Sequence, residues 1–214
     1  MRPRVEVVAI TGTEPVTLAT LKPHLRVTSA QENTYLTGLC KTARIKTESF
    51  TGRSIIKKTL RMWLDRPPGG SDEWFEGTQQ RSIGSLKGGK NYVELLQSPV
   101  QTVDAVTAYS DTDVPTVANA STYFLDNVDK NMLNRVALRT GQIWPIAIRQ
   151  TNGFSIDYTA GYNDGAVPDD LLHGMNMLAA WLFTHRGDYS DAKAIKDSDA
   201  YDFVQEYRYA RVSA

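Results

Sequence analysis

Residues 154–187, FSIDYTAGYNDGAVPDDLLHGMNMLAAWLFTHRG, contain the signals of a strand, a turn and a helix in direct succession. Phe154, Ile156 and Tyr158 alternate with polar residues, which is typical of a half-buried strand. The sequence AGYNDG then interrupts this alternation. Pro168 suits the first turn of a helix, and the two aspartates after it favour the positive end of the helix dipole.

The helix predicted over residues 168–186 has one apolar stripe that would face a core. The residues of this stripe recur at helical spacing and are Leu171, Leu172, Met175, Leu178, Ala179, Leu182 and Phe183. Gly187 follows as a left-handed stop. Trp181 lies outside the stripe, so it either widens the buried face or contacts another chain.

A second helix is predicted over residues 31–51. Ser29 and Glu32 have the spacing of a capping box. The apolar residues that follow at helical spacing are Tyr35, Leu36, Leu39, Ala43 and Phe50. Residues 18–25 favour a shorter helix before it, although Pro23 removes one of its hydrogen bonds.

Between these helices the apolar pattern changes to the alternation of strands. Strands are predicted over residues 60–64, 92–96, 100–109, 123–128, 135–138 and 154–159, which would form a small, mostly antiparallel sheet. The earlier apolar run 5–10 favours a strand or an extended arm. Residues 67–90 lack apolar periodicity and predict a projecting arm. Trp74 and Phe75 within this arm would either form an apolar tip or fold back on the sheet.

The composition excludes several classes of protein. Lys plus Arg and Asp plus Glu both total 24, so no strong overall field attracts nucleic acid or an anionic membrane. Cys40 is the only cysteine, which excludes an internal disulfide framework. The chain starts without the apolar run of a secretory signal and has no stretch that would span a bilayer, so we expect synthesis in a reducing cytoplasm and no membrane contact.

No set of residues predicts catalysis, a cofactor or a metal site. The glycine-rich residues 84–91, GSLKGGKN, fit a phosphate-binding loop except that Asn91 replaces the hydroxyl residue that holds magnesium. The strand-like sequence after this loop also differs from the helix that such a loop precedes. The three histidines are far apart, and Cys40 lacks a positioned histidine. We therefore expect an interaction protein rather than an enzyme, with nucleotide binding at residues 84–91 as one alternative.

A second alternative is DNA binding by the locally basic residues 41–58. The cations of this basic stretch are Lys41, Arg44, Lys46, Arg53, Lys57 and Lys58. Such a run is more often a solvated helix face than a phosphate-facing surface.

The last part of the chain carries an unusual cluster of aromatic residues. A polar stretch, 188–199, precedes Tyr201, Phe203, Val204, Tyr207, Arg208, Tyr209 and Arg211. These residues either form a final helix on their own domain or insert into a partner as an aromatic anchor.

In their order and spacing, several motifs resemble the head-to-tail adaptor, or connector, family of long-tailed bacteriophages and related gene-transfer particles. They are LATLKPHLRV at 18–27, ESFTGR at 48–53, the strand and turn of 93–106 around Ser98-Pro99-Val100, YTAGY at 158–162 and VPDDL at 167–171. Gly141 and Trp144-Pro145 are also similar to the family. The resemblance spans most of residues 17–187, whereas Pro23 and the arm 67–90 depart from the pattern.

The resemblance implies an α+β fold. This would be a helical bundle, with long helices near 31–51 and 168–186, an inserted small β region and an extended C-terminal tail. We expect one adaptor domain over 1–187, with a helical part (17–53 and 168–187) and a β part (54–160), and a tail over 188–214 that docks on a partner.

The family also implies a non-enzymatic role in the neck of a virion. Its members form rings, usually of twelve subunits, between the portal protein and a stopper or tail-completion protein, and the genomic DNA passes through without sequence-specific binding during packaging and ejection. The aromatic tail residues Tyr201 to Arg211 would contact the portal. Trp74, Phe75 and Trp181 would contact neighbouring subunits.

Overall fold

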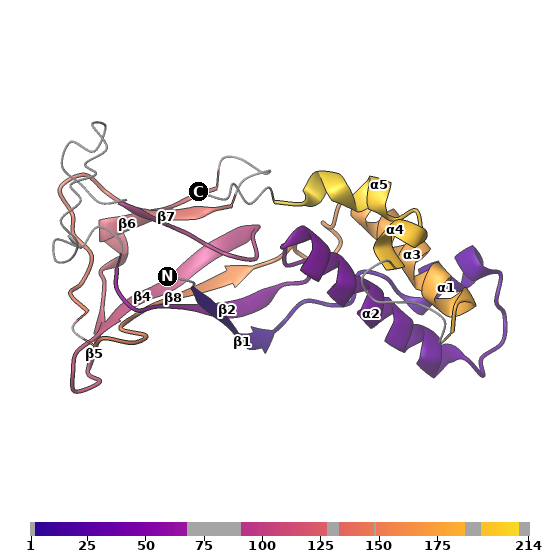
Figure 1. Cartoon of the computed structure of the whole chain (residues 1–214), viewed down its shortest axis with the longest axis horizontal. Helices are drawn as coiled ribbons and strands as arrows, with labels where there is room; N and C mark the ends of the chain where they lie inside the picture. The colour runs from indigo at the N-terminus through magenta and orange to yellow at the C-terminus, as the bar shows by residue number, and fades with distance from the viewer. Residues whose placement is uncertain (1–2, 68–90, 128–132, 148, 187–193, 210–214) are drawn as a thin grey trace, which may run out of the picture. The chain divides into compact units, whose positions relative to one another are not determined.

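The computed structural model describes residues 3–67, 91–127, 133–147, 149–186 and 194–209 (Figure 1). The chain divides into two compact units, and both are built from segments that are distant in the sequence. Unit 1 comprises Met1–Ala9, Thr59–Leu96 and Val100–Thr159. Unit 2 comprises Ile10–Lys58, Gln97–Pro99 and Ala160–Ala214.

A five-stranded sheet accounts for most of the strands. In spatial order its strands are β1 (Arg4–Ile10), β2 (Lys58–Leu64), β8 (Phe154–Ala160), β4 (Val100–Tyr109) and β5 (Pro115–Val117). The strand order places β1 and β5 at its two edges. The β4–β5 pair is antiparallel, with Thr107 opposite Val117.

Contacts near the strand ends give the direction of the other pairs. For β1 and β2, Trp63 donates to Glu6 and Thr11 donates to the carbonyl of Lys57. Early residues of one strand therefore face late residues of the other, as in an antiparallel pair. β2 and β8 are also antiparallel, because Asn152 N donates to Asp65 and Tyr162 N donates to the carbonyl of Ile55. β8 and β4 are antiparallel as well, because Tyr109 N donates to the carbonyl of Gly153 and Gly161 N donates to that of Pro99. Hence β1, β8 and β5 run in one direction.

The second sheet has three antiparallel strands. Its order is β3 (Tyr92–Glu94), β7 (Arg135–Leu138) and β6 (Tyr123–Asp126), and the short 3-10 helix η1 (Ala120–Thr122) leads into β6. Hydrogen bonds connect strands of the first sheet to loop residues beside the second: Tyr158 Oη of β8 donates to the carbonyl of Leu96, and Val100 N of β4 donates to Asn134 Oδ1. The apolar core of unit 1 gathers around β8, whose Phe154, Ile156 and Tyr158 are fully buried.

Unit 2 contains the helices. They are α1 (Leu18–Leu25), α2 (Asn33–Thr51), α3 (Asp169–Thr184), α4 (Ala194–Asp197) and α5 (Tyr201–Val204), followed by the 3-10 helix η2 (Gln205–Tyr207). The stripes of α2 and α3 pack against each other, and Leu36, Leu171, Met175 and Leu178 are fully buried there. None of the helices in the described part of the chain has the length and hydropathy needed to cross a membrane.

The predicted helical bundle with a small inserted β region is wrong. The described residues form eight strands in two sheets, and most of the five helices are short. Helices α2 and α3 do lie at the predicted positions, but at 19 and 16 residues they are of ordinary length. The strand β5, which was not predicted, has only 3 residues, so it carries too little alternation to be recognised from sequence.

Two local predictions are also corrected. The predicted extended C-terminal tail instead contains α4, α5 and η2. The capping box at Ser29 does not form, because Glu32 occupies the N-cap position of α2 and Ser29 Oγ accepts from Gln31 N. Gly52 ends α2 with a φ of 73°, which is the left-handed conformation that favours glycine.

Candidate interaction surfaces

The C-terminal segment, defined here as residues 194–209, packs on α3 in unit 2. Val204 is fully buried over Gly174, where an added Cβ would lie 2.9 Å from Val204 Cγ1. The Phe203 ring meets the His173 ring edge-on at 4.8 Å. Glycine at 174 is therefore required for this close approach, because any side chain there would push the segment away from α3.

Arg53 holds the end of this segment. Its Nε donates to the carbonyl oxygen of Tyr207 at 2.5 Å, and its guanidinium carbon lies 4.2 Å from the centre of the Tyr209 ring. Tyr209 N also donates to the carbonyl of Thr51 at the end of α2. Arg53 and Tyr209 are both buried. Burial raises the pKa of Tyr209 to about 12, so its hydroxyl stays protonated at neutral pH.

The basic stretch 41–58 does not present its cations as one surface. Arg44 forms ion pairs with Glu14 and Glu48, both at 2.8 Å, and Lys58 reaches Glu48 at 2.7 Å. These two cations and Arg53 are buried. Since half of the six predicted cations serve internal contacts, this stretch lacks the continuous basic face that a DNA-binding surface needs.

The glycine-rich loop lies largely outside the described residues. Only Asn91 of residues 84–91 is described, and strand β3 begins at the next residue. A phosphate-binding loop leads into a helix whose N-terminal amides receive the phosphates, so the element that follows this loop does not support nucleotide binding.

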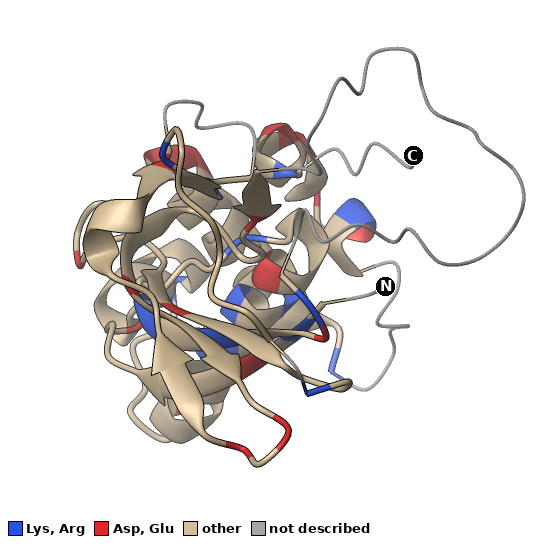
Figure 2. Cartoon of the chain, turned by 90° about the vertical axis from the view of Figure 1, so that its left-hand side faces the viewer, with Lys and Arg blue, Asp and Glu red and all other residues tan. Residues whose placement is uncertain are grey.

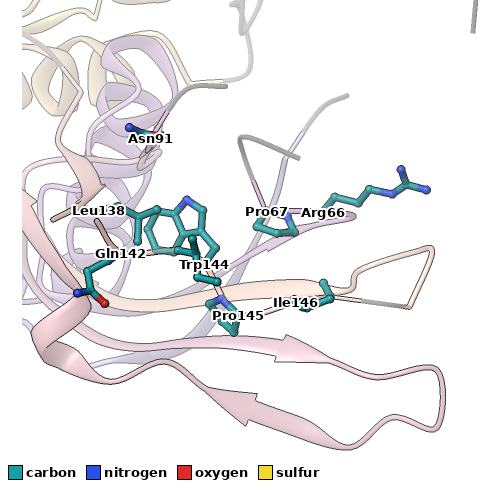
Figure 3. A pocket seen from close by; sticks show the side chains of 10 residues that line it. Arg66, Pro67, Asn91, Leu138, Gln142, Trp144, Pro145 and Ile146 are labelled. Carbon is teal, nitrogen blue, oxygen red and sulfur yellow. The ribbon is translucent and has the colours of Figure 1, made fainter. Parts of the chain in front are cut away.

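A pocket of about 350 Å³ lies in unit 1. Figure 3 shows Trp144, Leu138 and Pro67 around it, and the remaining lining residues are Arg66, Asn91, Gln142, Ile143, Pro145, Ile146 and Ala147. Trp144 is buried edge-on against Phe154, yet its Nε1 has no hydrogen-bond partner. Ile143 and Ile146 are the most exposed large apolar residues among those described, at 78% and 76%. The pocket thus combines apolar residues with the polar side chains of Arg66, Asn91 and Gln142.

The two edges of the five-stranded sheet are also exposed. Every residue of β5 is exposed, and six of the seven residues of β1 are as well. The apolar Val7 and Val8 of β1 are 47% and 52% exposed, and Val114 and Val117 beside and in β5 are 58% and 63% exposed.

The described residues contain no cluster of three or more His, Cys, Asp or Glu that could hold a metal ion. Cys40 is buried on α2, and burial raises the pKa of its thiol. A thiol held in the protonated form is a poor nucleophile.

Comparison with known proteins points to one kind of particle. No protein-family model and no curated protein matches the chain. A chain in the neck of an empty gene transfer agent (GTA) particle, computed with C6 symmetry, has a TM-score of 0.70 and 23% identity, and the match covers 99% of this chain and 97% of that one. The chain has this neck-chain fold.

Two further solved structures share the neck-chain fold. A chain in the virion of a native GTA particle has a TM-score of 0.68 at 21% identity, covering 97% of this chain and 96% of that chain. A chain in the neck of a native GTA particle, computed with C12 symmetry, has a TM-score of 0.64 at 24% identity, covering 99% and 97%. The similarity extends over almost the whole length of each chain.

The neck-chain fold brings together only some of the predicted contact residues. Of the residues predicted to dock on the portal, Val204 and Tyr209 are buried in unit 2. Tyr201, Phe203 and Tyr207 are partly covered by the same unit, and Arg208 is exposed. Arg211 lies outside the described residues.

Of the three predicted subunit contacts, the structure describes Trp181 alone. Trp181 is partly buried beside the core of unit 2, and its ring stacks on His185 at 4.4 Å. Trp74 and Phe75 lie outside the described residues. The sequence pattern did not predict the Trp144 pocket or the β5 edge, whereas residues 5–10, predicted as a strand or an extended arm, lie in β1. The sequence signal for the pocket is Trp144 close to Ile143 and Ile146 in a stretch without periodicity.

Proposed function

We propose that this protein is a structural component of the neck of a gene transfer agent or tailed-phage particle. The neck-chain fold supports this proposal, because the similarity to three chains of gene transfer agent particles covers 97–99% of this chain. The protein would act as the head-to-tail adaptor: a ring, of twelve subunits in the usual case, between the portal and a stopper or tail-completion protein. Genomic DNA would pass through the ring without sequence-specific contacts.

The single observation that carries the proposal is the match to neck chains in structures computed with C6 and C12 symmetry. Cyclic symmetry of this kind places identical copies around a channel. The balance of 24 cationic and 24 anionic residues is compatible with such a conduit, since a strongly basic lumen would retain DNA.

Within this role, the C-terminal residues 188–214 would dock on the portal, and residues 1–187 would form the adaptor domain. The packing of the C-terminal segment reduces the number of residues that could contact the portal. Val204 and Tyr209 serve the interior of unit 2, so the portal-facing surface would consist of Arg208, Arg211 and the exposed sides of Tyr201, Phe203 and Tyr207. Trp74, Phe75 and Trp181 remain proposed subunit contacts.

The test is cryo-electron microscopy of this protein co-expressed with the portal protein of the same genome. We expect a ring stacked on the portal with residues 200–214 at the junction. A second measurement compares Arg208→Ala with Glu206→Ala, an exposed charge on the same segment. Arg208→Ala should weaken capture by the portal at least tenfold, whereas Glu206→Ala should not. Absence of any ring and of any portal association would overturn the proposal.

A further inference from the structure

The two edges of the five-stranded sheet differ in length and composition, and both are open among the described residues. β1 is a strand of 7 residues, and β5 is a strand of 3 residues at the end of the β4–β5 hairpin. An edge strand presents unpaired backbone donors and acceptors, which natural proteins normally protect with charges, prolines or covering elements. A long, apolar open edge is therefore a surface that another strand can cover.

Both faces of the edge strand β1 carry exposed valines. Val7 and Val8 are consecutive, so they point to opposite sides of the sheet, and both are about half exposed. The edge at β5 carries Val114 and Val117, which are more exposed still. These four valines contribute little to the core of their own unit, so their exposure in a free chain is unfavourable.

The strand directions determine how two copies could join. β1 and β5 run in the same direction, because each of the four neighbouring pairs between them is antiparallel. A rotation about an axis roughly along the strands keeps this direction. It would place β5 of one copy beside β1 of the next in a parallel arrangement, with the N-terminal ends of the two strands adjacent. Contacts between two different surfaces generate a closed ring when the rotation between copies closes, whereas a contact of one edge with itself generates a dimer.

The charges at the starts of these strands are complementary. Arg4 begins β1 and is exposed. Asp111 and Asp113 lie in the turn that precedes β5, and Asp113 is 73% exposed even though it pairs with Arg149 of its own chain. Figure 2 shows the acidic colour at the tip of the β4–β5 hairpin. In the parallel arrangement these opposite charges meet at the same end.

We infer that the β1 edge of one copy lies against the β4–β5 hairpin of the next copy in the ring, with Val7 and Val8 covering Val114 and Val117, and Arg4 beside Asp111 and Asp113. This inference rests on the ring assembly proposed above and identifies one of its subunit interfaces. Pro115 in β5 lacks a backbone donor, so side-chain packing contributes more to the interface than a long hydrogen-bonded ladder.

Disulfide cross-linking of assemblies formed with the portal tests this interface. The starting protein is Cys40→Ala, so that no native thiol competes. The double variant Val8→Cys with Val117→Cys should give, on oxidation, a ladder of covalent oligomers that ends at the closed ring. Each single cysteine variant should remain monomeric on a denaturing gel. Val8→Cys combined with Ile45→Cys is the matched control, because Ile45 is 55% exposed on α2 and lies outside both edges.

The outcomes separate this interface from the function on which it rests. Rings that are visible by electron microscopy but give no ladder would overturn the interface and leave the adaptor role intact. Covalent dimers from Val8→Cys alone would also overturn it, in favour of β1 pairing with itself. No rings in any sample would overturn the adaptor proposal and this inference together. In support, Arg4→Asp should reduce the ring fraction several-fold, and Arg4→Asp with Asp111→Arg should restore it.

Discussion

Arg53 and Tyr209 stack with the guanidinium carbon 4.2 Å from the ring centre, and both side chains are buried. This contact connects the residue that follows the C-cap of α2 to the last described residue of the chain. Arg53 also donates to the carbonyl of Tyr207. One planar cation thus contacts both Tyr207, at the end of η2, and Tyr209, two residues further on.

Arg53→Lys is expected to loosen the C-terminal segment. Lysine keeps the charge but cannot stack and donate in the same plane, so the carbonyl of Tyr207 loses its partner. We expect a loss of about 1–3 kcal/mol in the free energy of unfolding. Hydrogen exchange of residues 201–209 should accelerate at least tenfold. Arg208→Lys, at an exposed cation over Phe50, is the control, and equal exchange in the two variants would contradict this role.

Glu48→Gln is expected to lower the free energy of unfolding far more than Glu32→Gln. Glu48 pairs with Arg44 and Lys58, and its other oxygen accepts from Ile55 N, all in a nearly buried site. Neutralising it removes the charge that pairs with buried Lys58 and leaves Arg44 with Glu14 as its acidic partner, which should cost about 3–5 kcal/mol. The exposed pair of Glu32 with Arg186 should contribute less than about 1 kcal/mol. Chemical denaturation of both variants measures the difference, and similar midpoints would refute it.

Gly161→Ala is expected to disrupt the backbone conformation directly after β8 and so to destabilise the protein. Gly161 has a φ of 107°, and an added Cβ would lie 2.1 Å from the carbonyl oxygen of Ile56. The strain and the clash together should cost about 3 kcal/mol or more. Gly38→Ala is the matched control, because a Cβ at this exposed position in α2 meets nothing within 4 Å. Alanine there should stabilise the protein by about 0.5–1 kcal/mol, as thermal unfolding would show.

Stability is expected to fall as the pH rises from about 10 to about 12. Burial raises the pKa of Tyr209 to about 12, above the value near 10 of an unfolded chain. The unfolded chain therefore loses this proton first, and the stabilisation present below pH 10 disappears across the window. Tyr209→Phe should make the decline in unfolding free energy shallower. An unchanged decline would show that Tyr209 does not contribute to it.

Trp144→Phe is expected to leave stability within about 1 kcal/mol of the original protein. The indole Nε1 has no partner, so its removal gives up no hydrogen bond. Trp144→Ala should cost about 3–5 kcal/mol, because it opens a cavity beside Phe154. Thermal unfolding compares the two variants. A large loss for phenylalanine would mean that the donor is in use.

The local periodicity of the sequence was sufficient to predict the positions of the two main helices and the central strand. Leu171, Met175 and Leu178 form the buried stripe of α3, as predicted, and Phe154 begins the buried face of β8. These elements repeat their apolar residues often enough for the period to be recognised. Their packing partners did not follow from the pattern, because it shows which face is buried but not what covers it.

The remaining errors concern contacts between distant parts of the chain. Arg44 reads as a member of a basic helix face, but Glu14 neutralises it from far earlier in the sequence. Arg53 likewise finds Tyr207 almost at the other end. Strand β5, which was not predicted, has 3 residues and is defined by its pairing with β4. No local window contains these partners, so the extent of the sheets, the burial of the cations and the packing of the C-terminal segment could not be derived from it.

The interleaving of the two units along the chain has a consequence for biosynthesis. Unit 2 needs Ile10–Lys58 and Ala160–Ala214, and α2 receives its apolar partner α3 only from the later segment. During translation, α2 therefore lacks its partner α3 until residues 169–184 have emerged from the ribosome. The core of the helical unit can form only after two segments that lie more than one hundred residues apart are both available.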